Sequence, residues 1–338
     1  MLLSNAEIFK MDDHDLAATL PRSRLTEIAT LIAIWLLVSA TSLFAFAGDA
    51  ITSHSGEVAR GGPADKFVDI GGVRLHYVDW GGQGRVVLFL AGFGNDAHVF
   101  DTFVPQFTAK FHAVGLTRRG FGQSDKPSDG YDIATRVRDI VSFLDAIGAD
   151  RVDVVGHSMA GDEMTVLASL HPDRVDRLVY LDAAYDHSEA IDLMLDDPGT
   201  PPQFQRLILE ARNSPKAAHV EVPDMPPPKE WDTLVKTIQG LRAYRIDYSR
   251  VTVPALAIYA DPGHYFGIEE GTPEAKRRSM ERWWQEHQHP SDLANIRQFK
   301  HQAAHGEVVE VKGASHYLFT GPTQAMVAAK VEAFLRRK

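Results

Sequence analysis

The chain has 338 residues, no cysteine, and a formal net charge of −10 at pH 7 from 35 basic and 45 acidic side chains. The length suffices for one large domain or two small ones, each with a buried core. The lack of cysteine excludes a disulfide scaffold, a cysteine nucleophile, a thiolate zinc site and an iron–sulfur cluster. The acidic balance argues against nucleic acid as a partner.

Residues 28–47 form an uncharged, mostly apolar run near the N-terminus. Arg22 and Arg24 precede the run, and Ala45-Phe46-Ala47 ends it with a small-x-small cleavage pattern. This layout is typical of a secretory signal peptide, so we expect export to the periplasm or the medium after cleavage near Ala47. The run is also long enough to remain as an uncleaved helix that attaches the protein to a membrane.

Beyond a linker over 48–65, short apolar segments alternate with amphipathic ones. Period-two alternation around Gly71-Gly72 predicts a β-hairpin. Further strands are predicted at 85–90, 111–116, 152–155, 177–181, 254–259 and 307–311. Helices are predicted at 98–109, 132–148, 159–171, 273–288 and 322–337. This alternation predicts an α/β fold: a mostly parallel, doubly wound sheet with helices on both faces and an antiparallel hairpin at one edge.

One segment, residues 185–252, interrupts this alternation after the sixth strand. Eight of the chain's 18 prolines lie between positions 198 and 228. Because so long an insertion in an α/β sheet is usually functional, we expect a helical cap over the carboxyl ends of the strands, where such sheets bind ligands. The predicted parts are a signal or anchor (1–47), the linker (48–65), the first part of the core (66–184), the cap (185–252) and the second part of the core (253–338).

The segment 152–161 has the pattern of a nucleophilic serine. Ser158 follows a predicted strand and precedes a predicted helix, with Gly156 and Ala160 two positions to either side. Small neighbours permit a sharp turn that exposes the hydroxyl at the strand end, and the helix then points its N-terminus at the reacting carbonyl. This strand–turn–helix context is more specific than the bare motif. His157, within the turn, is predicted to contact the substrate.

A serine nucleophile needs a base to take its proton and an acid to orient that base. These groups should follow the serine in the order acid, then histidine. His316 lies in a loop after the last predicted strand and is the predicted base. Asp261 directly follows the strand at 254–259 and is the preferred acid. Asp182, at the end of the preceding parallel strand, and Glu269 and Glu270 remain alternatives.

Two backbone N–H groups should stabilise the oxyanion that forms during acyl transfer. Met159, the residue after the nucleophile, is predicted to supply one. Phe93, in the turn after the strand at 85–90, is predicted to supply the other. Gly92 and Gly94 flank Phe93 and are predicted to let the substrate approach the backbone closely.

Together these motifs resemble the α/β-hydrolase superfamily over residues 66–338. The resemblance extends to Arg119-Gly120-Phe121-Gly122-Gln123-Ser124-Asp125, which is similar to the structural loop after the fourth strand in that family. The chain departs from the family pattern at Ala91, where histidine is frequent, and at Thr117, where aspartate is frequent. The resemblance implies a serine hydrolase that cleaves small-molecule carboxylic esters of small or medium apolar groups and needs no cofactor.

Other chemistry on the same fold remains open. The alternatives are lactone, amide or carbon–carbon bond hydrolysis, acyl transfer, cofactor-free haloperoxidation, and ligand binding by a non-catalytic receptor. Ser158 argues against the epoxide hydrolases and haloalkane dehalogenases of this fold, because these use an aspartate nucleophile. No metal site is predicted: the His301/His305 and His287/His289 pairs are interpreted as surface histidines. The oligomeric state is not predicted.

Overall fold

The computed structural model describes residues 62–337 except 214–227, 262, 266–267 and 269–270. The predicted signal or anchor at 1–47, most of the linker, and the alternative acids Glu269 and Glu270 therefore lie outside the described residues. Among the described helices, none is both long enough and apolar enough to cross a membrane.

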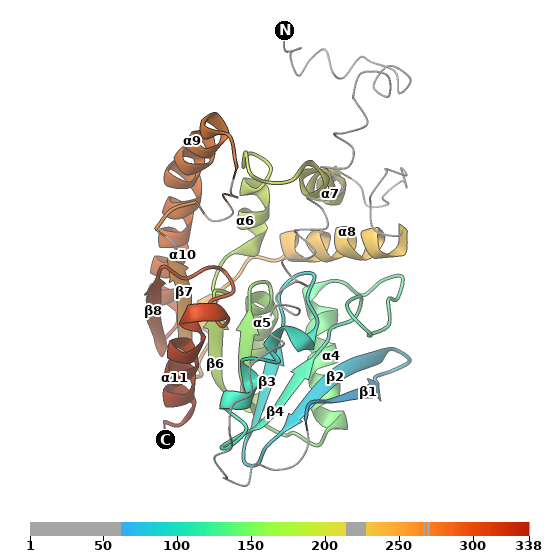
Figure 1. The fold of residues 1–338 in the computed structure, drawn as a ribbon. Helices are drawn as coiled ribbons and strands as arrows, with labels where there is room; N and C mark the ends of the chain where they lie inside the picture. The colour runs from blue at the N-terminus through green and yellow to red at the C-terminus, as the bar shows by residue number, and fades with distance from the viewer. Residues whose placement is uncertain (1–61, 214–227, 262, 266–267, 269–270, 338) are drawn as a thin grey trace, which may run out of the picture. The chain divides into compact units, whose positions relative to one another are not determined.

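An eight-stranded sheet forms the centre of the described part, in the order β1-β2-β4-β3-β5-β6-β7-β8 (Figure 1). The strands are β1 (Ala64–Asp69), β2 (Arg74–Gly81), β3 (Val86–Leu90), β4 (His112–Leu116), β5 (Val152–His157), β6 (Val175–Leu181), β7 (Ala255–Asp261) and β8 (Gly306–Lys312). β2 pairs antiparallel with both β1 and β4, and the pairings from β4 to β8 are parallel. The predicted mostly parallel sheet with an antiparallel edge is confirmed.

Two hydrophobic cores cover the two faces of the sheet. Because side chains alternate along a strand, Leu88 and Leu90 of β3 enter one core while Val87 and Phe89 enter the other. The first core also holds α4 (Ile133–Ala146), α5 (Ala160–Leu170) and α10 (His289–Gln302). The second holds α11 (Gln324–Leu335). Helices thus lie on both faces, as the apolar strands require.

Two helix predictions were wrong in detail. Residues 98–109 do not form one helix but two short 3₁₀ helices, η2 (Ala97–Phe100) and η3 (Val104–Gln106). Pro105 cannot donate a backbone hydrogen bond and disfavours a continuous helix there. The helix predicted over 273–288 is longer than expected: α9 (Glu274–Trp283) continues through a π-helical turn, η6 (Trp284–Gln288), into α10. Pro290 lies in the first turn of α10, where a missing N–H is tolerated.

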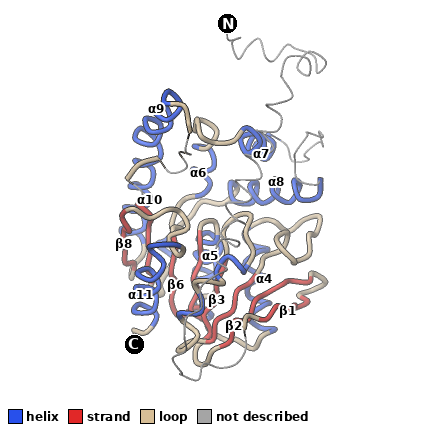
Figure 2. Tube along the Cα trace, viewed as in Figure 1, coloured by secondary structure: helices blue, strands red, loops and turns tan. Residues whose placement is uncertain are grey.

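Three of the described α-helices lie between β6 and β7, within the segment predicted as a cap. They are α6 (His187–Leu193), α7 (Pro202–Asn213) and α8 (Pro228–Arg242), which we call the inserted helices (Figures 1 and 2). α7 contacts the turn after β3, since the rings of Phe204 and Phe93 lie 6.1 Å apart. α8 contacts the loop after β4, since a Cβ on Gly120 would lie 2.6 Å from Thr233 Cγ2. α7 and α8 therefore lie next to the segments that follow the carboxyl ends of β3 and β4.

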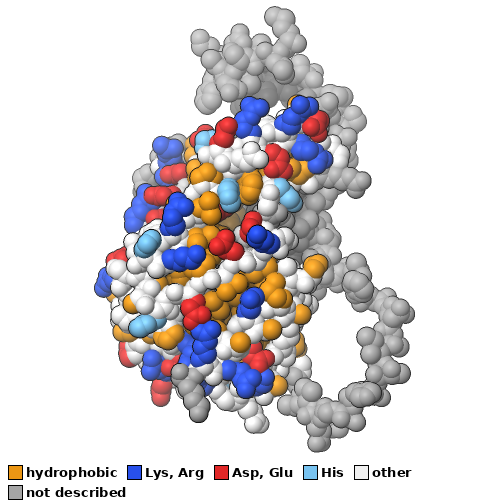
Figure 3. All heavy atoms as spheres, turned by 90° about the vertical axis from the view of Figure 1, so that its left-hand side faces the viewer, with side chains coloured by type: hydrophobic (Ala, Val, Ile, Leu, Met, Phe, Trp, Pro, Cys, Tyr) orange, Lys and Arg blue, Asp and Glu red, His pale blue; other side chains and the backbone are white. Residues whose placement is uncertain are grey.

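One face of the described part carries both signs of charge in close mixture. On the face that includes α9, α10 and β8, acidic and basic side chains alternate around small apolar areas (Figure 3). A hollow of about 360 Å³ opens beside this region, lined in part by Arg177, Pro254, His305 and Glu307. It lies at the amino ends of β7 and β8, whereas Ser158 follows the carboxyl end of the parallel strand β5. We therefore do not assign this hollow to a site around Ser158.

Candidate active site

Two strained residues lie at the ends of neighbouring strands. Among the described residues, Ser158 with φ 54° and Asp182 with φ 48° are the two non-glycine residues in the left-handed region. This conformation costs an L-residue about 1–2 kcal/mol. Ser158 directly follows β5 and Asp182 directly follows β6, and these strands are paired. Backbone strain that the surrounding structure maintains is commonly found at active sites.

The small residues around Ser158 are required by close packing of α5. A Cβ on Gly156 would lie 2.4 Å from Met164 Sδ. A Cβ on Gly161 would lie 1.8 Å from the carbonyl oxygen of Ala183. The start of α5 is therefore pressed against both its own strand and the segment after β6. This packing explains why the turn that carries Ser158 is flanked by glycine.

The structure pairs His316 with Asp182 and not with Asp261. His316 Nδ1 lies 2.7 Å from Asp182 Oδ2. The other oxygen, Asp182 Oδ1, accepts hydrogen bonds from the Tyr185 hydroxyl at 2.6 Å and from the Ala260 N–H at 2.8 Å. The Asp182 side chain is 7% exposed and that of His316 is 38% exposed. Asp182 is thus a nearly buried, fully hydrogen-bonded carboxylate that can orient an accessible imidazole.

The preference for Asp261 as the acid was therefore wrong, and the physical reason lies in the backbone. Asp261 is still within β7, in register with Lys312 of β8. Its Oδ1 accepts a hydrogen bond from the Gly263 N–H at 3.1 Å, so its carboxylate closes its own turn. Asp182, by contrast, leaves its strand through a left-handed residue, and its carboxylate meets His316.

His157 is buried and positions His316 through the backbone. The residue is only 1% exposed, so the prediction that His157 contacts substrate was wrong. His157 Nε2 donates a hydrogen bond to the carbonyl oxygen of His316 at 3.1 Å, and the two ring centroids lie 4.4 Å apart. Burial lowers the pKa of His157 well below its usual range, with the nearby His316 contributing. A neutral His157 therefore holds the segment that carries the predicted base.

The turn after β3 (residues 91–95), which we call the oxyanion loop, lies against Ser158. A Cβ on Gly92 would lie 3.0 Å from Ser158 Cβ and 2.9 Å from His157 Nδ1, so glycine is needed for this approach. Among the described residues, neither the Phe93 N–H nor the Met159 N–H has a hydrogen-bond acceptor. Both N–H groups are therefore available as donors, and their binding of an oxyanion stays a prediction.

Two contacts fix the shape of this loop. Gly94 adopts φ 78°, a conformation that favours glycine and turns the chain back toward η2. Asn95 Nδ2 donates a hydrogen bond to the Tyr317 hydroxyl at 3.1 Å. The loop after β3 is thereby linked to the residue next to His316. Gly94 itself has open space where a Cβ would lie, so its conformation and not close packing calls for glycine there, and its predicted contact with substrate stays a prediction.

A buried ionic cluster of Arg118, Arg136 and Glu163 holds the same loop, and the sequence did not predict it. Arg118 donates to the carbonyl oxygens of Ala91 at 2.5 Å and Gly92 at 3.0 Å. Its Nε and Nη2 each lie 3.0 Å from an oxygen of Glu163 in α5. Arg136 Nη1 donates to the same carboxylate at 3.1 Å. Arg118 thus links the carbonyl groups of Ala91 and Gly92 to Glu163, in the helix that follows Ser158.

The charge state of this cluster follows from its partners. Burial by itself would raise the pKa of Glu163, but the guanidinium groups of Arg118 and Arg136 outweigh it and lower the pKa. Glu163 is therefore ionised. One sign was present in the sequence: two adjacent acidic residues, Asp162 and Glu163, lie in the first turn of a helix that is otherwise mostly apolar. The partners of Glu163 could not be identified without the fold.

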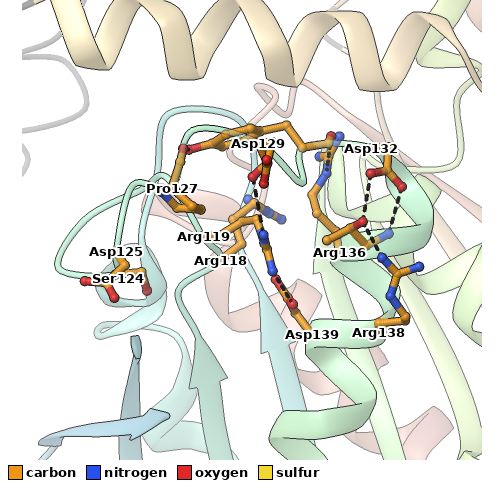
Figure 4. Close-up of polar contacts among 12 residues, drawn as sticks. Arg118, Arg119, Ser124, Asp125, Pro127, Asp129, Asp132, Arg136, Arg138 and Asp139 are labelled. Carbon is orange, nitrogen blue, oxygen red and sulfur yellow. Dashed lines mark hydrogen bonds and ion pairs between the residues drawn. The ribbon is translucent and has the colours of Figure 1, made fainter. Parts of the chain in front are cut away.

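The loop from Arg119 to Asp125 has the structural role that the resemblance implied (Figure 4). Arg119 forms two hydrogen bonds with Asp139 of α4, at 2.5 and 2.6 Å. The Ser124 hydroxyl donates to the Thr117 carbonyl oxygen at 2.6 Å, and Asp125 Oδ2 accepts from the Arg74 N–H at 2.8 Å. These contacts hold the loop between β2 and α4. The loop also brings Phe121 beside Phe93, with ring centroids 6.0 Å apart.

Asp292 in α10 makes the stability of the protein depend on pH. Burial raises the pKa of Asp292 to about 7; the hydrogen bond from Gln288 opposes this rise and the Asp182 carboxylate adds to it. In an unfolded chain the pKa would be about 3.9. Between these values the folded protein holds a proton that the unfolded chain has lost. The free energy of unfolding therefore falls as the pH rises from about 4 to about 7.

Between pH 5 and pH 8 the free energy of unfolding of the wild type should decrease. We predict that this decrease is smaller in Asp292→Asn, by on the order of 1–2 kcal/mol. Urea denaturation at the two pH values measures the difference. Asp173→Asn is the matched control, because Asp173 is exposed and its removal should leave the pH dependence as in the wild type. An unchanged pH dependence in Asp292→Asn would contradict the prediction.

The family model described as alpha/beta hydrolase fold matches residues 85–319. Over 128 residues the chain is 30% identical to a 2-(acetamidomethylene)succinate hydrolase from Mesorhizobium japonicum, across 38% of this chain and 46% of the relative. Over 119 residues it is 36% identical to epoxide hydrolase A from Mycobacterium tuberculosis, across 34% and 37%. Each match spans less than half the length of the curated relative.

Solved structures share the architecture more completely. A membrane phospholipase A aligns over 93% of this chain and 98% of its own, with a TM-score of 0.55 and 21% identity. A carboxylesterase from Bacillus subtilis aligns over 82% and 93%, with a TM-score of 0.55 and 13% identity. Identities this low show a common fold, and the chemistry must be argued from the residues of this chain.

Proposed function

The chain belongs to the α/β-hydrolase family, and we propose that it is a serine hydrolase that cleaves carboxylic esters of small or medium apolar substrates. Two observations carry the proposal: the strained turn of Ser158, whose neighbour His157 hydrogen-bonds to the His316 carbonyl oxygen, and the His316 imidazole that an almost buried carboxylate orients. His316 and Asp182 form that pair at 2.7 Å. Relatives named as hydrolases support the general class, and the ester substrate is our own inference.

In the proposed first step, Ser158 Oγ attacks the ester carbonyl carbon while His316 Nε2 takes the hydroxyl proton. The charge of the resulting imidazolium is stabilised by Asp182. Ser158 Oγ has no hydrogen-bond partner among the described residues, and catalytic hydrogen bonds of this kind commonly tighten only when substrate is bound. His316 then protonates the departing alcohol, and the acyl group remains on Ser158.

The negative oxygen of the tetrahedral intermediate would bind the free N–H groups of Phe93 and Met159. Each such donor typically contributes about 3–4 kcal/mol to transition-state stabilisation. Water then attacks the acyl-enzyme, with His316 again as base, and releases the acid. The nucleophile, the base, the acid and both oxyanion donors of this cycle are groups of the protein.

An apolar substrate is favoured by the aromatic side chains beside the oxyanion loop. The ring of Phe93 lies edge-on to Phe121 at 6.0 Å and to Phe204 of α7 at 6.1 Å. Phe93 therefore forms part of an apolar surface between the core and the inserted helices. A hydrocarbon acyl or alcohol group would gain about 25 cal/mol for each Å² of apolar surface removed from water there.

Fluorophosphonate labelling followed by a panel of p-nitrophenyl esters tests the proposal. We expect one label on Ser158 and turnover that depends on acyl chain length. Ser158→Ala should abolish the label and lower kcat/KM at least about 10⁴-fold. Ser142→Ala is the control, because Ser142 is an exposed serine on α4. Labelling without turnover of any ester, lactone or amide would favour a receptor, whereas turnover restricted to lactones or amides would replace the ester by that class.

We also propose that residues 1–47 direct export, with membrane attachment through 28–47 if they are retained. The proposal rests on the basic, apolar and small-residue pattern of this segment. The intact mass of the exported protein separates cleavage near Ala47 from retention of the full segment.

A further inference from the structure

We propose that Asp65, His76 and His98 form a binding site for one divalent transition-metal ion, for which Zn²⁺ is the probe. Among the described residues these three make the one group of at least three potential ligands whose ligand atoms all lie within 4.8 Å of one another. The residues come from three separate segments, β1, β2 and η2. The site is distinct from Ser158 and its partners and is not part of the proposed hydrolysis.

Both imidazoles direct their Nε2 atom at the same carboxylate oxygen of Asp65. His76 Nε2 lies 2.7 Å and His98 Nε2 lies 2.8 Å from Asp65 Oδ1. The two rings are stacked, with centroids 5.6 Å apart and an interplanar angle of 28°. Two neutral imidazoles and one carboxylate are a donor set that suits zinc and similar transition metals. The arrangement is therefore two nitrogen ligands and one oxygen ligand around a shared centre.

The second nitrogen of each ring is held by its own partner. His98 Nδ1 lies 2.9 Å from Asp101 Oδ2, and Asp101 Oδ1 accepts a hydrogen bond from the Trp80 indole N–H at 2.9 Å. His76 Nδ1 lies 2.9 Å from Thr117 Oγ1. A hydrogen bond at Nδ1 fixes the ring and directs Nε2 to the metal, and such partners are typical of zinc-binding histidines.

The site combines one rigid side with one that can adjust. The side chain of His76 is fully buried, whereas those of His98 and Asp65 are 34% and 50% exposed. Zinc ligands lie about 2.0–2.2 Å from the ion, which places neighbouring tetrahedral ligand atoms about 3.4 Å apart. Asp65 must therefore withdraw by about 0.6 Å, and its position on the edge strand β1 permits this. Solvent can reach the half-exposed side and supply a water as the fourth ligand.

A bound ion would join the sheet edge to the oxyanion loop. Asp65 lies in β1, the edge strand, and His76 lies in the neighbouring β2. His98 belongs to η2, which begins two residues after Asn95 at the end of the oxyanion loop. The ion would thus stabilise an edge strand and the base of that loop. We expect the metal to raise thermal stability, since it binds the folded arrangement and no such arrangement exists in the unfolded chain.

The test uses full-chain protein without an affinity tag, freed of metal with a chelator and titrated with ZnCl₂ in a calorimeter. We expect one Zn²⁺ per chain, a visible absorption spectrum when Co²⁺ replaces it, and a higher melting temperature with Zn²⁺. His98→Ala and Asp65→Asn should each abolish stoichiometric binding and the melting shift. Asp101→Asn, which keeps all three ligands, should weaken binding about 10- to 100-fold.

The double variant His301→Ala/His305→Ala is the matched control, because it removes two exposed histidines that lie outside the site. It should bind Zn²⁺ as the wild type does. Far-UV circular dichroism verifies that the substitutions at the half-exposed Asp65 and His98 leave the fold intact. The proposal is overturned if the wild type binds no stoichiometric Zn²⁺, or if binding persists in both ligand variants. Loss of binding in the control alone would place the ion at the surface histidines and also overturn it.

Discussion

Asp182→Asn is expected to lower kcat for p-nitrophenyl butyrate about 10⁴-fold, whereas Asp261→Asn leaves kcat close to the wild-type value. His316 Nδ1 lies 2.7 Å from Asp182 Oδ2. An amide at this position cannot stabilise the imidazolium and can present its NH₂ group to Nδ1, which favours the wrong tautomer. Asp261 holds only its own turn, through the Gly263 N–H at 3.1 Å. Steady-state kinetics of the two variants measured side by side provide the test.

The two substitutions form a matched pair, because each replaces a carboxylate at the end of a parallel strand by an isosteric amide. Circular dichroism and fluorophosphonate labelling then separate catalysis from folding. Asp182→Asn should retain the fold and label Ser158 slowly, since the serine is present but poorly activated. Near-normal turnover in Asp182→Asn, together with a large loss in Asp261→Asn, would contradict the assignment.

Glu163→Gln is expected to reduce the free energy of unfolding by about 3–5 kcal/mol, as is usual when one partner of a buried ion pair is removed. The substitution leaves Arg118 and Arg136 without their shared counter-charge. The side chains of these two arginines are 7% and 2% exposed, so water cannot replace it. Urea denaturation of the purified variant measures the loss.

The same substitution should lower kcat, because Arg118 also binds the carbonyl oxygens of Ala91 and Gly92. Without Glu163 to fix the guanidinium, the loop that carries Phe93 N–H is less well held, and misplacement of an oxyanion donor weakens transition-state stabilisation. Glu307→Gln is the control: Glu307 pairs with Arg337, and both side chains are about half exposed. Exposed ion pairs of this kind contribute about 0–1 kcal/mol to the free energy of unfolding. An equal effect of the two substitutions would show that the buried cluster has no special role.

Much of the site could be predicted because its signals are local. The turn around Ser158 needs small residues within a few positions, and the structure shows those residues packed against Met164 and Ala183. The histidine after the last strand could be named from its place in the alternation of strands and helices. Errors arose at two prolines, because Pro105 divides a predicted helix whereas Pro290 is tolerated in the first turn of α10.

The acid and the buried supports could not be predicted in the same way. Asp182 and Asp261 both stand at the ends of parallel strands, and nothing in their neighbourhoods along the chain separates them. Their difference depends on the left-handed backbone of Asp182 and on donors from Tyr185 and Ala260. Likewise, Arg118 and Glu163 are 45 positions apart, so their salt bridge becomes visible only when β4 and α5 are placed together.

The sequence by itself therefore determined the class of fold, and it predicted the nucleophile, the base and the loop next to them. These properties follow from periodicity and from small residues at fixed spacing, which act over a few neighbouring positions. Only the tertiary structure decided which carboxylate orients His316, that His157 is a buried support, and that Asp65, His76 and His98 converge. Those outcomes depend on distances between side chains far apart along the chain, and such distances are set by how the strands and helices pack.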